Sequence, residues 1–220
     1  MGPAGKCVQP DGLPQRPLLL AAMRIVLASQ SPSRASILRG AGVEPIIAPA
    51  HVDERTIEDR LAGEDPEDIV CALATAKAEA IAPSYPSDVV VGGDSMLLLG
   101  GSLQGKPHTP EATVERWHAQ AGRTAELITG HCVLYGDKRF VEASCTTVHF
   151  AQATDADIEA YAHTGEPLEC AGAFTLEALG GWFIDRIEGD PSSVIGLSLP
   201  VLRRALYSCG LDVADFWTKP

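Results

Sequence analysis

The chain has 220 residues, of which 45% are hydrophobic and 21% charged, a composition typical of a globular protein with a substantial core rather than of a disordered chain. Its 17 basic and 29 acidic residues give a net charge of −12, which argues against broad binding to nucleic acid or to anionic membrane surfaces. An anionic ligand would therefore need a local group of cations.

Residues 1–22 are predicted to form a disordered N-terminal tail, because prolines and glycines interrupt them repeatedly. The apolar run at residues 18–22 is too short to span a membrane, and its flanks do not make a signal peptide. The six cysteines have neither paired spacing nor metal-ligand spacing, so we interpret them as reduced thiols of a cytoplasmic protein. Residues 23–220 are expected to form a single domain.

The ordered pattern begins with an apolar strand at residues 25–28, a serine-rich turn and an amphipathic helix that starts at Pro32 after an N-cap serine. The start of such a helix exposes unpaired N–H groups at the positive end of the helix dipole, which favours an anion. The same stretch carries three hydroxyls and a guanidinium that suit a phosphate: Ser29, Ser31, Ser33 and Arg34. The alternative interpretation is that these residues merely cap a surface helix.

A short strand at residues 46–48 precedes the acidic pair Asp53 and Glu54, and the stretch 58–66 is expected to be a loop. A long helix follows, and the period of its apolar positions places Lys77 at the edge of the buried face. We therefore expect the aliphatic stem of Lys77 to pack while its ammonium reaches a cleft.

Three consecutive valines at residues 89–91 predict a strand covered on both faces. Gly92 and Gly93 are expected to let a ligand approach the backbone at its end, with Asp94 at the tip. Residues 95–99 are expected to continue as a strand, and a hairpin turn at Gly100-Gly101 then leads back to Lys106. The later elements are expected as a helix at 110–121, strands at 124–135 and 139–150, a helix capped by Asp155 and reaching His163, a strand at 182–187 and a helix at 200–208.

Three cations, Arg34, Lys77 and Lys106, occur in the motif-like segments described above. Acidic residues lie at predicted strand ends and in a loop: Asp53, Glu54, Asp94 and Glu166. Phosphoanhydride hydrolysis needs such a set, because carboxylates hold Mg²⁺ or Mn²⁺ and cations neutralise phosphate charge. A further carboxylate orients or deprotonates the attacking water. Each residue also has a structural alternative, since helical lysines are usually solvated and aspartates after glycines usually form turns.

The sequence lacks the motifs of three other classes of site: it contains no GxxxxGK[ST] phosphate loop, no GxSxG nucleophile turn and no HExxH zinc site. His131 is the histidine expected nearest a cleft. We interpret it as a buried, hydrogen-bonded side chain.

Several short motifs occur in order between Met23 and Leu211: Leu27 to Arg34, Val52-Asp53-Glu54, Ala76-Lys77-Ala78, Gly93-Asp94-Ser95, Gly105-Lys106-Pro107, Thr129-Gly130-His131, Gly165-Glu166-Pro167, Ala171 to Phe174 and Gly189 to Leu197. In this order they resemble the Maf family of nucleoside triphosphate pyrophosphatases. The resemblance implies an enzyme that uses a divalent metal cation, Mg²⁺ or Mn²⁺, to hydrolyse a nucleoside triphosphate to the monophosphate and pyrophosphate. It also implies an α/β fold with a curved mixed β-sheet flanked by helices and two lobes with a central cleft, as in inosine-triphosphate pyrophosphatases.

The resemblance also assigns roles to individual residues. Asp94 matches the proton acceptor, and Arg34, Lys77 and Lys106 match cations that face the triphosphate. The implied metal ligands are Asp53, Glu54 and Asp94, and the implied substrate-binding residues are Ser29, Ser31, Ser33, Ser95 and Glu177. Three of these depart from the common pattern at positions implicated in base choice, namely Ser33, Ser95 and Glu177. The base preference of the family therefore does not transfer, although Glu177 resembles the branch that acts on 7-methyl-guanosine triphosphate.

The leading hypothesis is a house-cleaning hydrolase that prevents incorporation of non-standard nucleotides. A nucleotide-binding regulator of cell division and septum formation with little turnover is the second hypothesis, and a generic phosphatase that releases inorganic phosphate first is the third. The expected partner is a nucleoside triphosphate rather than nucleic acid or a membrane, and the resemblance is compatible with a homodimer.

Overall fold

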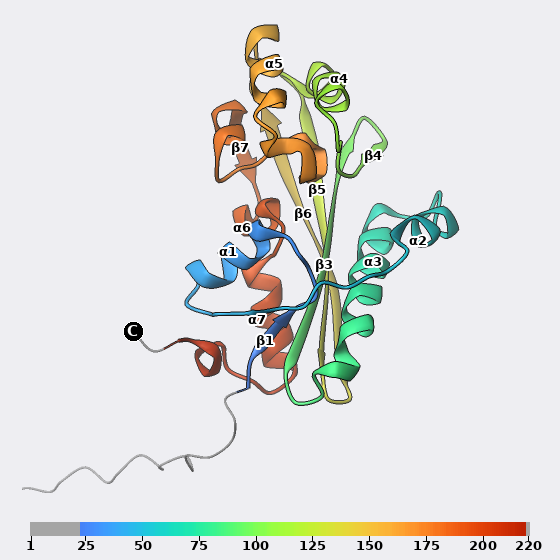
Figure 1. The fold of residues 1–220 in the computed structure, drawn as a ribbon, viewed down its shortest axis with the longest axis vertical. Coiled ribbons are helices and arrows are strands. Elements are labelled where there is room, and N and C mark those ends of the chain that lie inside the picture. Colours follow the sequence, from blue (N-terminus) through green and yellow to red (C-terminus); the bar gives the residue numbers. More distant parts are fainter. Residues whose placement is uncertain (1–22, 219–220) are drawn as a thin grey trace, which may run out of the picture.

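The computed structural model describes residues 23–218, so the tail predicted at residues 1–22 lies outside the described residues. A seven-stranded mixed sheet has the order β2-β1-β3-β5-β6-β7, with β4 paired to β3. The strands are β1 (Ile25–Leu27), β2 (Ile46–Ile47), β3 (Val89–Leu99), β4 (Ser102–Gln104), β5 (Thr124–Tyr135), β6 (Lys138–Phe150) and β7 (Ile184–Glu188). The helices are α1 (Pro32–Gly40), α2 (Glu54–Arg60), α3 (Pro66–Ile81), α4 (Pro110–Gln120), α5 (Asp155–His163), α6 (Pro191–Ile195) and α7 (Leu199–Ser208). Helices lie on both faces of the sheet, which confirms the predicted α/β fold (Figure 1).

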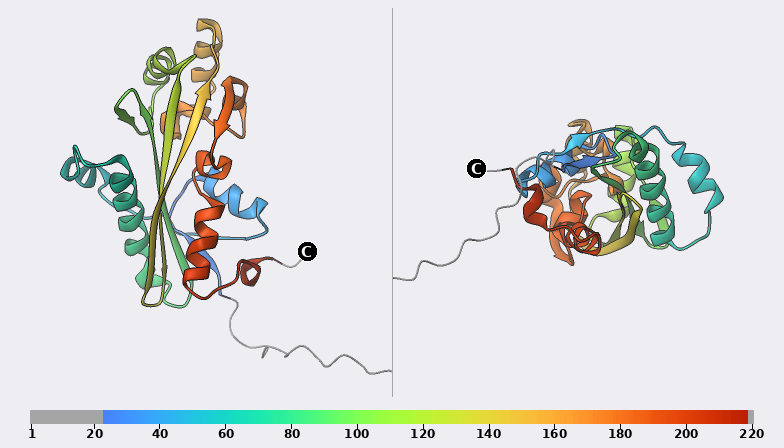
Figure 2. Two further views of the ribbon diagram at one scale, coloured as in Figure 1. Left: turned by 180° about the vertical axis from the view of Figure 1, so that it is seen from behind. Right: turned by 90° about the horizontal axis from the view of Figure 1, so that it is seen from below.

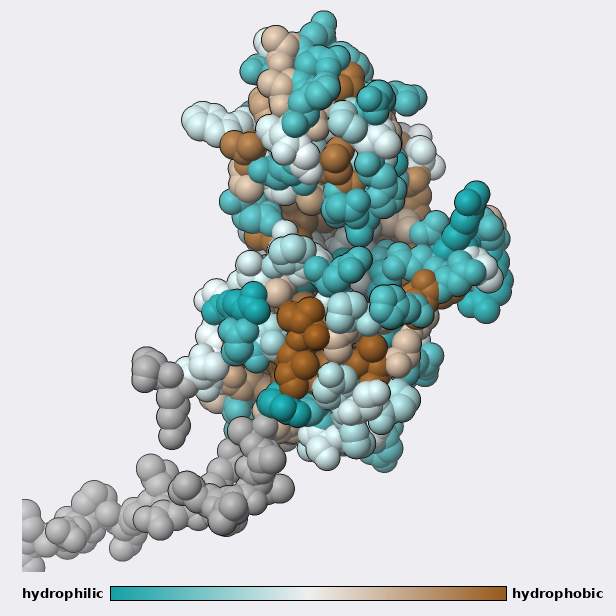
Figure 3. All heavy atoms as spheres, viewed as in Figure 1, coloured by the Kyte–Doolittle hydropathy of each residue, from teal (hydrophilic) through white to brown (hydrophobic). Residues whose placement is uncertain are grey.

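The long strands β3, β5 and β6 run through two lobes (Figure 1). In one lobe α4 and α5 pack on a core where Trp117 makes edge-on ring contacts with Phe150 and Tyr161, at centroid distances of 5.6 and 5.7 Å. In the other lobe α3 covers one face of the sheet and α7 the opposite face (Figure 2). The space-filling view is hollowed between the lobes, as the predicted central cleft requires (Figure 3).

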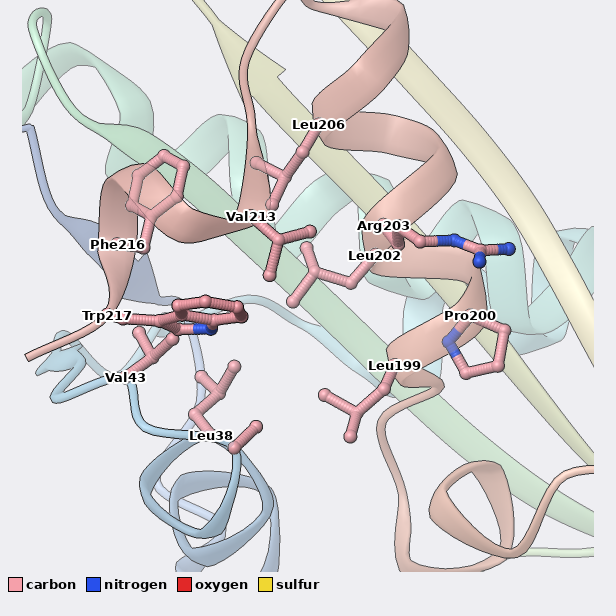
Figure 4. Close-up of a pocket in the computed structure, with 11 residues that line it drawn as sticks. Leu38, Val43, Leu199, Pro200, Leu202, Arg203, Leu206, Val213, Phe216 and Trp217 are labelled. Atoms are coloured by element: carbon pink, nitrogen blue, oxygen red, sulfur yellow. The ribbon is translucent and has the colours of Figure 1, made fainter. Parts of the chain in front are cut away.

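An apolar pocket with a volume of about 380 Å³ lies between α1, α7 and the C-terminal segment (Figure 4). Leu38, Leu202, Leu206 and Trp217 are among the side chains that line it. The residues predicted to form the functional site lie elsewhere, so this pocket is separate from the predicted chemistry. Among the described helices, none is long and apolar enough to cross a membrane.

Two glycines on adjacent strands determine how closely α3 approaches the sheet. A Cβ on Gly92 would overlap the carbonyl oxygen of Ala74, and a Cβ on Gly130 would overlap the carbonyl group of Val70. Because neither strand carries a side chain there, the backbone of α3 lies directly on β3 and β5. The expectation that Gly92 lets a ligand approach is therefore wrong, since the helix occupies that space.

Gly92→Ala is expected to lower the free energy of unfolding by about 2 kcal/mol, because the added methyl group pushes α3 off the sheet. Urea unfolding followed by circular dichroism measures this change. Gly40→Ala is the matched control, since a Cβ at Gly40 meets nothing within 4 Å and should leave stability unchanged or slightly raised. Equal stability of the two variants would contradict the close packing.

Two local expectations about where helices begin and end differ from the structure. The segment 58–66 is not a loop throughout, since α2 continues to Arg60. Thr154 rather than Asp155 caps α5, because the Thr154 hydroxyl accepts a hydrogen bond from the backbone N–H of Asp157 at 3.2 Å.

Candidate active site

Asp94 lies in the middle of β3 rather than at its tip. The strand continues to Leu99 because β5 supplies pairing partners along it, with Asp94 opposite Gly130 and Ser95 opposite Thr129. Only 8% of Asp94 is exposed. The expectation that Asp94 lies at a tip is therefore wrong, whereas the expected continuation of the strand over residues 95–99 is confirmed.

Lys77 of α3 meets this carboxylate directly. Its Nζ atom lies 2.6 Å from Asp94 Oδ1 and 3.0 Å from Glu54 Oε1. Lys77 is 8% exposed, which confirms the prediction that its stem packs in the core while its ammonium reaches a polar cleft. An ammonium has three donors, so one remains for an anionic ligand.

Arg34 of α1 contacts Ser95, the residue next to Asp94 on β3. Its Nε atom donates to the carbonyl oxygen of Gly196 at 2.7 Å, and its two terminal nitrogens donate to the hydroxyls of Ser29 and Ser95, both at 3.2 Å. Gly93 lies beneath, where a Cβ would come within 3.4 Å of the Arg34 Nε. A guanidinium has five N–H donors, so two remain for a ligand.

The charges of these groups act on one another. Burial lowers the pKa of Arg34 from its ordinary value, while Asp94 and Glu54 act to raise it. Burial, followed by the negative charges of Asp94 and Glu54, raises the pKa of Glu58. The sequence analysis missed Glu58, which lies one helical turn after Glu54 and would have been found by that spacing had α2 been recognised.

Asp53 caps α2, and Thr56 donates a hydrogen bond to each of its carboxylate oxygens. The backbone N–H of Thr56 donates to Oδ1 at 3.1 Å and its hydroxyl donates to Oδ2 at 2.8 Å. These hydrogen bonds lower the pKa of Asp53 and cap α2. The cap fixes Glu54 as the first helical residue, beside Lys77.

No group of three or more acidic, histidine or cysteine side chains within residues 23–218 is arranged to hold a metal ion by itself. Mg²⁺, however, is usually held through one or two carboxylates, with water and substrate phosphates completing its shell. Glu54 and Asp94 supply two carboxylates that converge on one point, the ammonium of Lys77. The donor set thus fits a cation shared with a substrate.

The start of α1 has the predicted form. Ser31 caps the helix, and its hydroxyl accepts from the backbone N–H of Arg34 at 3.4 Å. Ser29 is buried, and its hydroxyl also accepts from the backbone N–H of Ser31 at 3.1 Å. Ser33 is half-buried in the first turn of the helix. Of these hydroxyls, that of Ser29 contacts the Arg34 guanidinium directly.

Lys106, unlike Lys77, makes its ion pair with Glu169 rather than with Asp94 or Glu54. Its Nζ atom lies 3.2 Å from Glu169 Oε2, and 45% of its side chain is exposed. Arg116 of α4 holds this loop by donating to the carbonyl oxygens of Gly105 and Lys106. Arg116 belongs to no recognised motif, and sequence reasoning missed it.

Glu166 holds the loop that carries Glu177. Its carboxylate accepts from the backbone N–H groups of Leu179 at 3.2 Å and Gly180 at 3.0 Å, and from the Tyr161 hydroxyl at 3.1 Å. Partial burial acts to raise the pKa of Glu166, but a hydrogen bond from the Thr175 hydroxyl, together with those from Gly180, Leu179 and Tyr161, outweighs it and brings the pKa below its ordinary value. Glu177 itself is exposed on this loop.

His131 is 1% exposed and fully hydrogen-bonded. Its Nε2 atom accepts from the backbone N–H of Ser198 at 2.8 Å, so Nδ1 carries the proton and donates to the carbonyl oxygen of Glu142 at 3.3 Å. Burial lowers the pKa of His131 to about 4. The interpretation of His131 as a buried, hydrogen-bonded histidine is confirmed.

This shift makes stability depend on pH. Above the ordinary pKa of 6.5 both folded and unfolded chains hold a neutral His131, and below it only the unfolded chain gains a proton until the pH nears 4. The free energy of unfolding should therefore fall by about 2 kcal/mol from pH 7 to pH 5 on account of this residue. Urea unfolding at pH 7 and at pH 5 measures this change. The His131→Gln variant should lose less stability between the two pH values than the wild-type protein, and an identical loss in both proteins would contradict the prediction.

Comparison with known proteins places these residues in a family context. A family described as Maf-like protein matches residues 24–209. The nucleoside triphosphate pyrophosphatase of Corynebacterium aurimucosum is 87% identical over 197 residues, which cover 90% of this chain and 100% of the relative. The enzyme of the same name from Nocardia farcinica is 54% identical over 206 residues, covering 89% of this chain and 97% of the relative. Among solved structures, the Staphylococcus aureus Ham1 protein is similar with a TM-score of 0.38 and 18% identity, over 59% of this chain and 73% of that one.

Proposed function

The chain belongs to the Maf family, and from that membership we propose that it hydrolyses a nucleoside triphosphate to the nucleoside monophosphate and pyrophosphate. The observation that carries the proposal is the buried ion pair between Lys77 and Asp94, 2.6 Å long. At the next residue of the same strand, the guanidinium of Arg34 donates a hydrogen bond to the Ser95 hydroxyl. In a chain with a net charge of −12, these two cations form the local anion site that the overall charge does not provide.

The reaction is an in-line displacement at the α-phosphorus. Asp94 orients a water molecule and accepts its proton as the water oxygen bonds to phosphorus. The bond between the α-phosphorus and its bridging oxygen breaks, and the electron pair leaves with pyrophosphate. The unused N–H groups of Arg34 and Lys77 stabilise the charge that develops on the leaving group, with Lys106 contributing from its loop.

Glu54 and Asp94 are the residues that would hold a divalent cation, Mg²⁺ or Mn²⁺. When bound, the cation neutralises phosphate charge and aligns the anhydride. Each carboxylate contacts Lys77 through one oxygen. The second oxygen of Glu54 is left for the cation, and the two lone pairs on the second oxygen of Asp94 serve the cation and the proton of the attacking water. Asp53 contributes indirectly, because it caps the helix that carries Glu54.

Ser33, Ser95 and Glu177 are the proposed determinants of base choice. The exposed carboxylate of Glu177 is an acceptor suited to the amino and imino donors of a guanine edge. Discrimination at these positions would allow removal of modified nucleotides, a house-cleaning role. A regulator of septum formation that only binds nucleotide would not need a proton acceptor beside Lys77.

A pyrophosphate-release assay across ordinary and modified triphosphates, with and without Mg²⁺, tests this function. Release of pyrophosphate that depends on Mg²⁺ is the expected result. Binding without release for every triphosphate would favour the regulator, and inorganic phosphate as the first product would favour a generic phosphatase.

A further inference from the structure

A chain of hydroxyls, half-buried at Ser95 and fully buried at Thr129, leads from Arg34 to α6. The Arg34 guanidinium donates to Ser95 Oγ at 3.2 Å, and Ser95 Oγ lies 2.9 Å from Thr129 Oγ1. Thr129 Oγ1 in turn donates to the carbonyl oxygen of Ser193 at 3.0 Å. The Nε atom of Arg34 donates to the carbonyl of Gly196, just after the same helix, so the segment 193–196 holds the guanidinium at two points.

The direction of each hydrogen bond follows from the number of protons. The Ser193 carbonyl only accepts, so it takes the single hydroxyl proton of Thr129. Ser95 must then donate its own proton to Thr129, which leaves a Ser95 lone pair for Arg34. Loss of the Thr129 hydroxyl would free the Ser95 proton to turn elsewhere and would loosen one of the three contacts that hold Arg34, leaving those with Gly196 and Ser29.

The far end of this chain is closed to solvent and hydrogen-bonded to a neighbouring strand. Thr129 and Ser193 are both 0% exposed. Ser144 of β6 lies between them, with its hydroxyl 2.6 Å from that of Ser193 and 3.3 Å from the carbonyl oxygen of Thr129. A substrate in the cleft does not reach Thr129, so any effect of this residue on the reaction passes through Ser95 and Arg34.

We propose that Thr129 is a positioning residue that fixes the plane of the Arg34 guanidinium toward the triphosphate. The proposal rests on the proposed function, because it takes Arg34 to bind the substrate phosphates. Two parallel N–H groups grip a phosphate only while their plane is fixed. Misplacement of a charged group by about 1 Å costs on the order of a hundredfold in rate, even when the altered residue does not touch the substrate.

Thr129→Val and Thr129→Ser form a matched pair, since valine keeps the shape without the hydroxyl and serine keeps the hydroxyl. We expect Thr129→Val to lower kcat about 10- to 100-fold with a smaller change in KM, and Thr129→Ser to retain most of the wild-type rate. Isothermal titration with inorganic pyrophosphate should show weaker binding to Thr129→Val only. Equal losses in both variants, or none in either, would overturn the proposal.

A double-mutant cycle with Arg34→Ala separates positioning from a merely structural role. If Thr129 acts through Arg34, then Thr129→Val should have no further effect on pyrophosphate affinity in the Arg34→Ala background. An undiminished effect there would refute the proposal. Should Thr129→Val fail to fold, Ser95→Ala interrupts the same chain at a less buried residue and takes its place in the cycle.

The two proposals fail in different ways. If the wild-type protein releases no pyrophosphate from any triphosphate, the proposed function is wrong, and the binding cycle still decides the role of Thr129. If the wild-type enzyme turns over but the cycle is additive, only the positioning role is wrong.

Discussion

Asp94→Asn should lower turnover about 10³-fold while leaving nucleotide affinity within a few-fold of the wild-type value. An asparagine amide preserves the shape of the side chain but does not accept the proton of the attacking water. Lys77 keeps its ion pair with Glu54, so the cation that binds phosphate stays near its place. Pyrophosphate release gives kcat, and titration with a non-hydrolysable triphosphate analogue gives affinity.

Asp137→Asn is the control for this change, because the same substitution there affects an exposed residue in the turn between β5 and β6. It should leave both quantities unaltered. Unchanged turnover in Asp94→Asn would remove the assigned role, and equal losses of turnover and affinity would make Asp94 a binding residue instead.

Lys77→Met should affect both stability and activity. The substitution leaves the Asp94 carboxylate, whose side chain is 12% exposed, without its ammonium partner. Breaking a buried ion pair from one side costs about 3 kcal/mol of unfolding free energy, and turnover should fall at least about 100-fold because phosphate charge is no longer neutralised. Urea unfolding and pyrophosphate release measure the two effects.

The double variant Lys77→Met with Asp94→Asn removes both charges, and most of the lost stability should return while activity stays lost. Lys138→Met is a comparison at a lysine that donates to the Cys209 carbonyl, where the expected cost is only about 1 kcal/mol. A double variant no more stable than Lys77→Met would show that the ion pair does not explain the stability of this region.

Much of the fold follows from local signals in the sequence. Ser31 and Pro32 mark the start of α1, and Gly136 with Asp137 marks the turn of the β5–β6 hairpin. The helical period around Lys77 predicts that its stem is buried while its ammonium reaches out of the packed face, and Lys77 is indeed buried. These features depend on residues within a few positions of one another, so the sequence alone is sufficient to predict them.

The details of the candidate site depend on contacts between distant segments. Arg34 is held by Ser95 and by Gly196, 61 and 162 positions along the chain. Gly92 serves the packing of α3 rather than a ligand, because Ala74 lies directly above it. No local pattern encodes such approaches, which arise only when helix and sheet pack.

The most direct test of the account is hydrolysis in oxygen-18 water, followed by mass spectrometry of both products. Attack on the α-phosphorus from the cleft of Asp94, Lys77 and Arg34 predicts label in the nucleoside monophosphate and unlabelled pyrophosphate. Label in pyrophosphate, or labelled inorganic phosphate as the first product, would contradict it.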